Sequence, residues 1–218
     1  LRDLVPLCSA EMQEMTVDRN PNWGITRVCA GIDWGVLGGN TRTVLTIGGL
    51  QPDGTIRVFY AKKFPVDQDP TEQVTEICRE INAAGCFLVA ADRGNGHVAN
   101  SFLKKALPNT RIVEIEYKAK IAQGMYYNDK TKTWITDRTR AVAGIIIDIK
   151  RKKFIFPRQE VMSTFFDDLI TLSCAYNDYL RAYQILRQGG APDDFAHALT
   201  YLRLGARFLV SAPRALNH

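Results

Sequence analysis

The sequence lacks a cysteine pattern, because its five cysteines match no known motif. Their number is odd, they are scattered, and no two of them have Cys-x-x-Cys spacing. Cys29 and Cys86 stand among apolar neighbours, as buried free thiols usually do. A disulfide framework and a zinc site of the Cys-x-x-Cys type are therefore excluded, and the pattern indicates a reducing compartment.

A long apolar run is also missing, so no segment is long enough to span a bilayer. Residues 1–3 contain neither an initiator Met nor the basic and then apolar layout of a signal peptide. We therefore expect a soluble chain that does not associate with a membrane. We also expect that it was cut from a longer protein. A phosphate loop of the form G-x-x-x-x-G-K-[ST] is absent, which excludes ATP hydrolysis by that route.

The sequence does contain enough apolar residues for a sizeable core. Of its 218 residues, 46% are hydrophobic and 23% are charged, which excludes a disordered chain and fits one large domain, or a domain with an extension. Lys and Arg number 28 against 23 Asp and Glu, so the formal net charge is +5. This excess favours a polyanionic partner without identifying it.

The order of strand and helix patterns predicts one α/β domain. Strands at 26–34, 42–47 and 55–60 are joined by short turns and predict an antiparallel meander. A helix with a capping start at Asp69, an apolar strand at 86–92, a second helix and a strand at 111–117 follow. We then expect a β-hairpin at 125–135, a helix from Asp137, a short strand at 153–156, a long helix to 189–190 and a last helix starting at 192–194.

These elements predict a mixed sheet of five or more strands with helices on both faces and a β-hairpin insertion. The domain itself covers residues 23–210. Residues 1–22 are assigned to a linker or the tail of an upstream domain, and residues 211–218 to a C-terminal tail.

Carboxylates stand where strands end or helices begin, which is where side chains of different elements converge. Asp33 ends the first strand and Asp92 ends the apolar fourth strand. Taken alone, Asp33 is better explained as a turn residue, and Asp92 could simply cap the next helix. Asp193 and Asp194 begin the last helix, where a cap explains one acid better than two. His197 lies three residues after Asp194, so both share one helix face.

The simplest topology makes the first and fourth strands parallel neighbours, which brings Asp33 and Asp92 together, and the last helix can add Asp193 or Asp194. Carboxylates forced together repel one another unless they share protons or bind a cation, and oxygen ligands suit Mg²⁺ or Mn²⁺. Two such ions would activate a water and stabilise the leaving oxygen of a phosphodiester. The sequence therefore indicates metal-dependent phosphodiester hydrolysis.

Other acids compete for the third position. The pair Asp167 and Asp168 lies inside a helix with no glycine turn, and we interpret it as surface-facing. Glu114 projects from a strand and is the more credible substitute, whereas Asp148 is interpreted as a solvated helical residue.

The segment from residue 118 to 158 holds most of the surplus positive charge. Tyr126, Tyr127 and Trp134 are interleaved with it, and they fit a nucleic-acid surface as well as a hairpin core. Contacts of this kind position a duplex without reading its sequence. The candidate DNA-binding residues are Lys118, Lys120, Lys130, Lys132, Arg138, Arg140, Lys152 and Lys153.

The motifs at 31–35, 91–96 and 192–199, in this order and spacing, resemble the nuclease domain of viral (bacteriophage) large terminase subunits, of the ribonuclease H-like superfamily. The resemblance covers about residues 28–204. It implies that Asp33, Asp92 and one of Asp193 and Asp194 hold two Mg²⁺ or Mn²⁺ ions. It also implies an endonuclease that cuts double-stranded DNA during genome packaging in the host cell cytoplasm.

By the same resemblance, an upstream ATPase motor domain, a small terminase subunit and a portal protein are expected partners. The chain departs from the family pattern at two places. Pro192 precedes the acid pair and His197 stands where a later Asp is usual, which leaves His197 open as a further metal ligand. Residues 36–40 also lack an acid that some relatives carry.

Three alternative functions remain open. A Holliday-junction resolvase or a transposase of the same fold would use the same acids. A catalytically inactive nucleic-acid-binding module would keep the basic surface alone. An actin-like nucleotide-binding domain matches only the Asp33-Trp34-Gly35 motif and comes last.

Overall fold

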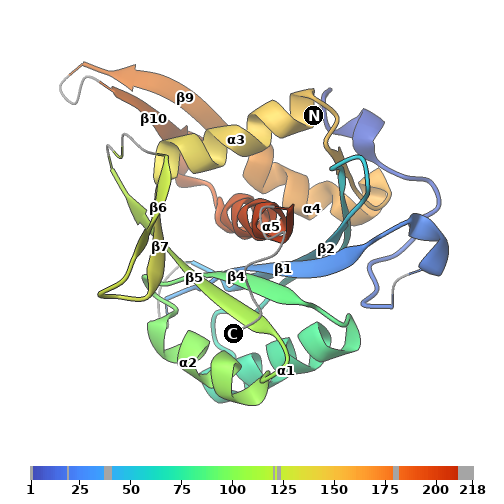
Figure 1. Cartoon of the computed structure of the whole chain (residues 1–218). Helices are drawn as coiled ribbons and strands as arrows, with labels where there is room; N and C mark the ends of the chain where they lie inside the picture. The colour runs from blue at the N-terminus through green and yellow to red at the C-terminus, as the bar shows by residue number, and fades with distance from the viewer. Residues whose placement is uncertain are drawn as a thin grey trace.

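The computed structural model describes residues 2–18, 20–36, 41–119, 121, 124–178 and 182–210. An eight-stranded mixed sheet divides these residues into two helical layers. Helices α1 and α2 cover one face of the sheet, and α3, α4 and α5 cover the other (Figure 1). The predicted α/β fold with helices on both faces is confirmed. None of the helices in the described ranges is long and apolar enough to cross a membrane.

The strand order of the main sheet is β6-β7-β5-β4-β1-β2-β3-β8. The antiparallel meander of β1 to β3 and the antiparallel β6–β7 hairpin are present as predicted. Strand β4 is the parallel neighbour of both β1 and β5, and β7 runs parallel to β5. The strands are β1 (Arg27–Asp33), β2 (Val44–Leu50), β3 (Ile56–Lys63), β4 (Leu88–Asp92), β5 (Arg111–Lys118), β6 (Met125–Asn128), β7 (Thr133–Asp137) and β8 (Phe154–Ile155).

Strand β1 illustrates how the central strands divide the core. Val28, Ala30 and Ile32 point to the side of α1 and α2, whereas Cys29 belongs to the cluster under α5. Both sets are buried because helices cover both faces, which explains the nearly continuous apolar sequence. With this alternation, Asp33 lies on the same side as Cys29, toward α5.

The helices begin where the sequence places caps. The Asp69 carboxylate accepts hydrogen bonds from the backbone N–H groups of Thr71 and Glu72. The Asp137 carboxylate caps α3 in the same way through the N–H of Arg140. The helices are α1 (Pro70–Ala83), α2 (His97–Ala106), α3 (Arg138–Lys150), α4 (Gln159–Ile170) and α5 (Asp194–Val210), with short 3₁₀ turns at Val5–Leu7, Pro21–Trp23 and Gln188–Gly190.

The long helix predicted up to residue 190 is wrong. Helix α4 ends at Ile170, and β9 (Leu172–Asn177) and β10 (Ala182–Arg187) form a separate two-stranded hairpin that projects from the domain (Figure 1). Leu, Tyr and Ile occupy this segment, and the residues fit a strand once backbone pairing is available. The hydrogen bond from the N–H of Gln188 to the carbonyl of Thr171 closes the base of the hairpin.

The N-terminal residues pack on the domain. Leu4, Leu7 and Met12 are buried. The N–H of Ser9 donates to the carbonyl of Phe156, directly after β8. Their role as a linker from an upstream domain stays a prediction, and the predicted tail at 211–218 lies outside the described residues.

Candidate active site

The acids predicted from the sequence meet at one edge of the sheet. Asp33 and Asp92 end the parallel neighbours β1 and β4, and the register pairs Ile32 with Ala91, one residue before each acid. Asp194 is the first residue of α5, which lies across β1. Two strands and one helix thus bring three carboxylates to the carboxyl edge of the sheet, as we expected.

Burial and mutual repulsion disturb the acids at this edge. The pKa of Asp33 is raised well above its ordinary range by burial and then by the charges of Asp92, Asp194 and Asp193, while Arg138 opposes the shift. Burial likewise raises the pKa of Asp194, although the N–H of Arg42 donates to its Oδ2 at 3.1 Å. The cluster is therefore electrostatically unfavourable unless a proton or a cation neutralises it.

Asp92 is held in place by two hydrogen bonds. Its Oδ2 accepts from the backbone N–H of Asn95 at 3.0 Å, and its Oδ1 accepts from the hydroxyl of Tyr201 on α5 at 3.1 Å. By contrast, no residue of the described ranges donates a hydrogen bond to the Asp33 carboxylate. The donor set is thus made of carboxylate oxygens, the ligands that Mg²⁺ and Mn²⁺ prefer.

The three acids suit a divalent cation by chemistry and by place in the fold. Among the described residues, however, no group of three His, Cys, Asp or Glu side chains is arranged to hold a metal ion as it stands. Binding of a cation at this edge would therefore require the carboxylate side chains to move closer together.

Asp193 has different partners from its neighbour. It is 4% exposed, and its carboxylate contacts the guanidinium groups of Arg138 and Arg187 at 3.3 Å and 3.2 Å. The Nε2 atom of His197 lies 3.2 Å from the same carboxylate, and Nδ1 is buried with no partner among the described residues. The candidate ligand His197 thus already uses Nε2 in contacts with protein groups.

The interpretation of Asp168 as surface-facing is wrong. Asp168 is 2% exposed, and its carboxylate accepts from the N–H of Phe195 at 2.9 Å and from the Nζ of Lys63 at 2.7 Å. It therefore caps α5 from another helix and helps to fix where Asp194 stands. Its position three residues after the buried Phe165 on α4 was the signal in the sequence.

The substitute Glu114 does not join the cluster. It is buried on the α2 side of the sheet, where Lys104 and Arg93 lie 3.2 Å and 3.8 Å from its carboxylate oxygens.

A buried amide ties together the two strand ends behind the acids. The indole Nε1 of Trp34 donates to Oδ1 of Asn100 at 2.9 Å, and Nδ2 of Asn100 donates to the carbonyl of Asp92 at 2.8 Å. Asn95 adds a hydrogen bond to the carbonyl of Trp34. Because Trp34 follows Asp33, this network couples the backbones that carry both acids. The sequence did not predict this network, because Trp34 is far from Asn95 and Asn100 along the chain.

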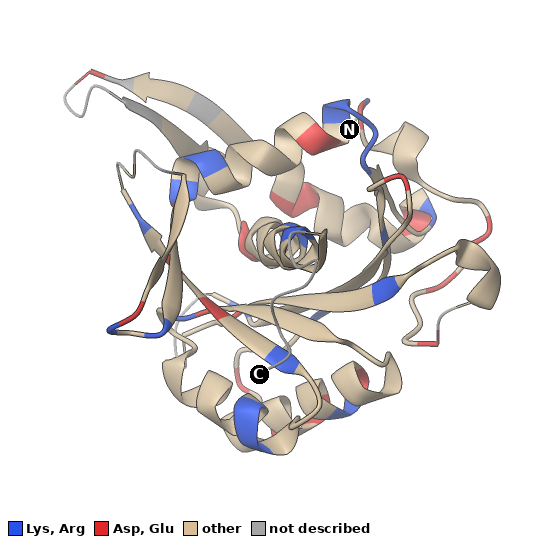
Figure 2. Cartoon of the chain, viewed as in Figure 1, with Lys and Arg blue, Asp and Glu red and all other residues tan. Residues whose placement is uncertain are grey.

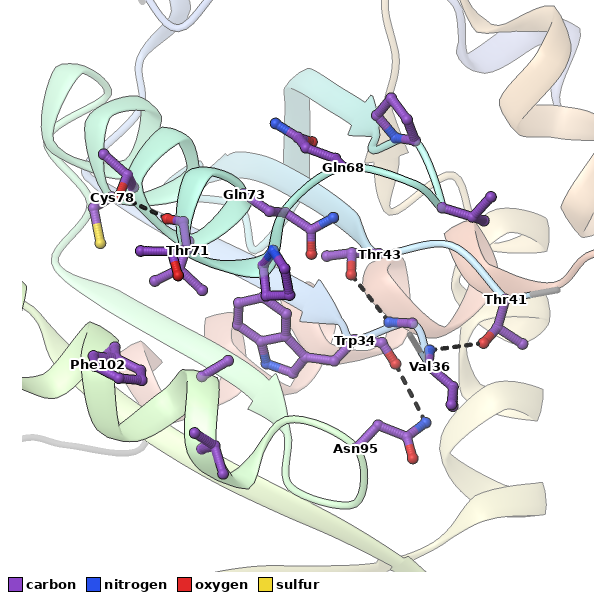
Figure 3. A pocket seen from close by; sticks show the side chains of 18 of the residues that line it. Trp34, Val36, Thr41, Thr43, Gln68, Thr71, Gln73, Cys78, Asn95 and Phe102 are labelled. Atoms are coloured by element: carbon purple, nitrogen blue, oxygen red, sulfur yellow. Dashed lines mark hydrogen bonds between the residues drawn. The ribbon is translucent and has the colours of Figure 1, made fainter. Parts of the chain in front are cut away.

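An apolar pocket of about 570 Å³ lies on the other side of this network, between α1, α2 and the end of β1 (Figure 3). Trp34 and Phe102 contribute to its walls, with Asn95 at its rim. The pocket and the acid cluster lie on opposite faces of the sheet.

The candidate DNA-binding residues do not form one surface. Lys118 ends β5 beside Glu116, and Arg138 and Arg140 begin α3, all near the acid edge. Lys130 and Lys132 lie on the β6–β7 turn, where Tyr126 and Tyr127 are exposed. Lys152 and Lys153 lie between α3 and β8, away from the edge of the sheet that holds the acids. Lys120 lies outside the described residues.

Trp134, one of the interleaved aromatic residues, is partly buried and packs against the core. Its ring packs against Phe208 of α5 with the centroids 4.8 Å apart.

The fold of this chain is shared with solved structures. No family model matches the chain, and no curated protein matches it. Solved structures do match, and they show that the chain has the ribonuclease H-like fold of the nuclease domains of large terminase subunits, which confirms the predicted fold class.

Three of these structures span most of the chain. The nuclease domain of the large terminase subunit of bacterial virus Sf6, solved with manganese, has a TM-score of 0.58 at 11% identity, over 90% of this chain and 98% of that one. The large terminase nuclease of thermophilic phage G20c has a TM-score of 0.57 at 13% identity, over 88% and 93%. The bacteriophage HK97 large terminase has a TM-score of 0.58 at 15% identity, over 93% of this chain and 42% of that chain. At these identities the likeness concerns the fold.

Proposed function

We propose that this protein is a metal-dependent endonuclease that cuts double-stranded DNA. The observation that carries the proposal is the convergence of Asp33, Asp92 and Asp194 from β1, β4 and α5 at one edge of the sheet. The described similarity to terminase nucleases, one of them solved with manganese, supports the same reading.

The three carboxylates would hold two Mg²⁺ or Mn²⁺ ions, which supply activation of a water and stabilisation of the leaving oxygen of a phosphodiester. Tyr201 and the N–H of Asn95 keep Asp92 oriented toward this site. Arg42 and Asp168 do the same for the start of α5, one through Asp194 and the other through Phe195. The chain's contribution is thus to fix the carboxylates before the ions and DNA arrive.

The role in the cell that we propose is genome packaging by a viral large terminase. In that setting an ATPase motor domain precedes this domain, and a small terminase subunit and a portal protein are its partners. Residues 1–22 would then connect the two domains. The similarity of the chain to 42% of the longer HK97 large terminase chain supports this arrangement.

The proposal is tested by plasmid cleavage with Mg²⁺, Mn²⁺ or EDTA. Asp33→Asn, Asp92→Asn and Asp194→Asn should each reduce cleavage by more than about 100-fold, because even residues that only support a metal ligand are worth 10–100-fold. Asp67→Asn changes an exposed carboxylate in a loop and should cleave like the unchanged protein.

Two results would change the assignment. Preferential cutting of four-way junctions over linear duplex would identify a junction resolvase. Plasmid binding that survives EDTA, with no cleavage under any metal, would identify an inactive binding module.

A further inference from the structure

Asp193 and Asp194 are adjacent in the sequence but have different surroundings. Asp194 lies with Asp33 and Asp92 at the sheet edge and accepts one backbone hydrogen bond. Oδ1 of Asp193 accepts from Arg187 at 3.2 Å, and Oδ2 accepts from Arg138 at 3.3 Å. Because both oxygens of this carboxylate already accept hydrogen bonds from guanidinium groups, it is a poor ligand for a cation.

The two arginines come from different elements that end at the same place. Arg138 is the first residue of α3, directly after β7, and Arg187 is the last residue of β10. Asp193 directly precedes α5. Figure 1 shows that the start of α3 and the base of the β9–β10 hairpin lie near the start of α5. The charges of Asp193 and Arg138 both act on Asp33, and Arg187 contacts Asp193, so the three residues lie beside the acid cluster.

The group has an excess of positive charge and free donors. Two guanidinium groups and one carboxylate leave a net charge of about +1. The Arg138 and Arg187 side chains are 50% and 43% exposed, whereas the Asp193 side chain is 5% exposed. A guanidinium has five N–H donors, so most of them remain available to a ligand in solvent. The charge of Arg138 also reaches Asp33, where it opposes the rise in pKa.

We propose that Asp193 is a positioning residue that holds Arg138 and Arg187 as a two-arginine site for a DNA phosphate next to the acid cluster. Guanidinium groups bind phosphate through paired hydrogen bonds, and a carboxylate behind them fixes the direction of the fork. This inference rests on the proposed nuclease function, because the bound phosphodiester belongs to the strand that is cut. Arg187, which sequence analysis did not single out, becomes a DNA contact.

The first test measures DNA affinity against salt concentration in EDTA. Arg187→Met should reduce the slope of log affinity against log salt by about 0.9, the value for one lost phosphate contact. Arg187→Lys should keep the slope but lower kcat, since Lys keeps the charge without the fork. Arg79→Met is the matched control, because Arg79 is an exposed arginine on α1, on the other face of the sheet.

The second test separates the two acids by titrating Mn²⁺ calorimetrically. Asp194→Asn should lower Mn²⁺ affinity at least tenfold. Asp193→Asn should bind Mn²⁺ within about twofold of the unchanged protein and bind DNA no more weakly. It should still cut with a kcat reduced about tenfold or more, because the arginines are no longer held. Circular dichroism melting establishes that each variant is folded.

Two outcomes would overturn the inference. One is an Arg187→Met protein with an unchanged salt slope. The other is an Asp193→Asn protein that loses as much Mn²⁺ affinity as Asp194→Asn. If the unchanged protein neither binds Mn²⁺ nor cuts DNA, the nuclease proposal fails instead, and the salt slope in EDTA still decides whether the two arginines bind phosphate.

Discussion

Two neighbouring acids at the start of α5 have pKa values shifted in opposite directions. Burial raises the pKa of Asp194, and the nearby acids add to the shift. Burial acts on Asp193 in the same sense, but the hydrogen bond from His197 and the charges of Arg187 and Arg138 outweigh it and lower the pKa. The partners of a carboxylate therefore decide whether it remains a stable anion or needs a cation.

Asp33 provides a test of this electrostatic balance without any cleavage assay. Its raised pKa means that, between the unfolded and folded pKa values, the folded chain retains a proton that the unfolded chain has released. The contribution of Asp33 to the stability of the metal-free protein therefore falls as the pH rises from its unfolded pKa to its folded pKa. In EDTA at neutral pH, Asp33→Asn should raise the free energy of unfolding, and the difference should narrow toward pH 4.

Urea unfolding at several pH values measures this effect. Adding Mn²⁺ should stabilise the unchanged protein more than the Asp33→Asn variant. A variant that is less stable in EDTA at neutral pH would contradict the repulsion inferred for the cluster.

At the level of elements, α5 decides how the site is assembled. All of its 17 residues except Arg207 and Val210 are buried, so the helix is a central core element. Its backbone lies directly on β1 at Gly31, where a Cβ atom would stand 2.1 Å from the carbonyl oxygen of Ala198. Only glycine allows this approach, which brings Asp194 down to the level of the strand ends.

Gly31→Ala should therefore lower the free energy of unfolding by about 3 kcal/mol or more, since the new methyl group meets backbone atoms that cannot rotate away. Gly205→Ala, on α5 itself, is a milder comparison, because its Cβ would first meet a side-chain methyl of Leu88 at 3.1 Å. Urea denaturation of both variants gives the two values. Equal losses would show that α5 moves easily on the sheet.

At the level of the whole molecule, positive charge is distributed over separate regions. Figure 2 shows basic residues at both ends of α3 and on the β6–β7 hairpin. The register places Trp134 beside Ile115 and Ile115 beside Asp92, so the hairpin turn lies two strands, about 10 Å, from the acids. Lys153 lies far from this hairpin. Its neighbour Phe154 pairs with Ile56 of β3, and through β2 this position is level with Arg27, at the amino end of β1.

Asp33 is at the other end of β1, about 20 Å further along the strand. Screening over about 8 Å at physiological salt separates these two regions. The double variant Lys130→Gln with Lys132→Gln should therefore weaken DNA binding and reduce the salt slope by roughly 0.9 per lost phosphate contact.

The control is Lys152→Gln with Lys153→Gln. It removes the same charge and, like the first pair, includes one lysine with a positive φ angle. Its salt slope should stay close to that of the unchanged protein. Equal losses for the two pairs would mean that DNA follows the whole length of α3 to the far side of the sheet.

Much of the fold was predictable because its signals are local. The capping residues Asp69 and Asp137, the apolar strand that ends at Asp92 and the meander of β1 to β3 follow from neighbouring residues alone. The placement of Asp33 and Asp92 side by side followed from one topological rule applied to that order.

The sequence by itself thus determined the elements up to residue 170, the last helix, their order and which acids end them, since hydrogen bonding and burial patterns act over a few residues. Only the tertiary structure decided that Asp168 caps α5, that Asp193 belongs to two arginines, and that residues 172–187 pair as strands. Each of these features depends on partners from other elements or on backbone pairing within a hairpin. A side chain's role is then set by the groups that folding brings to it, and no local pattern contains that information.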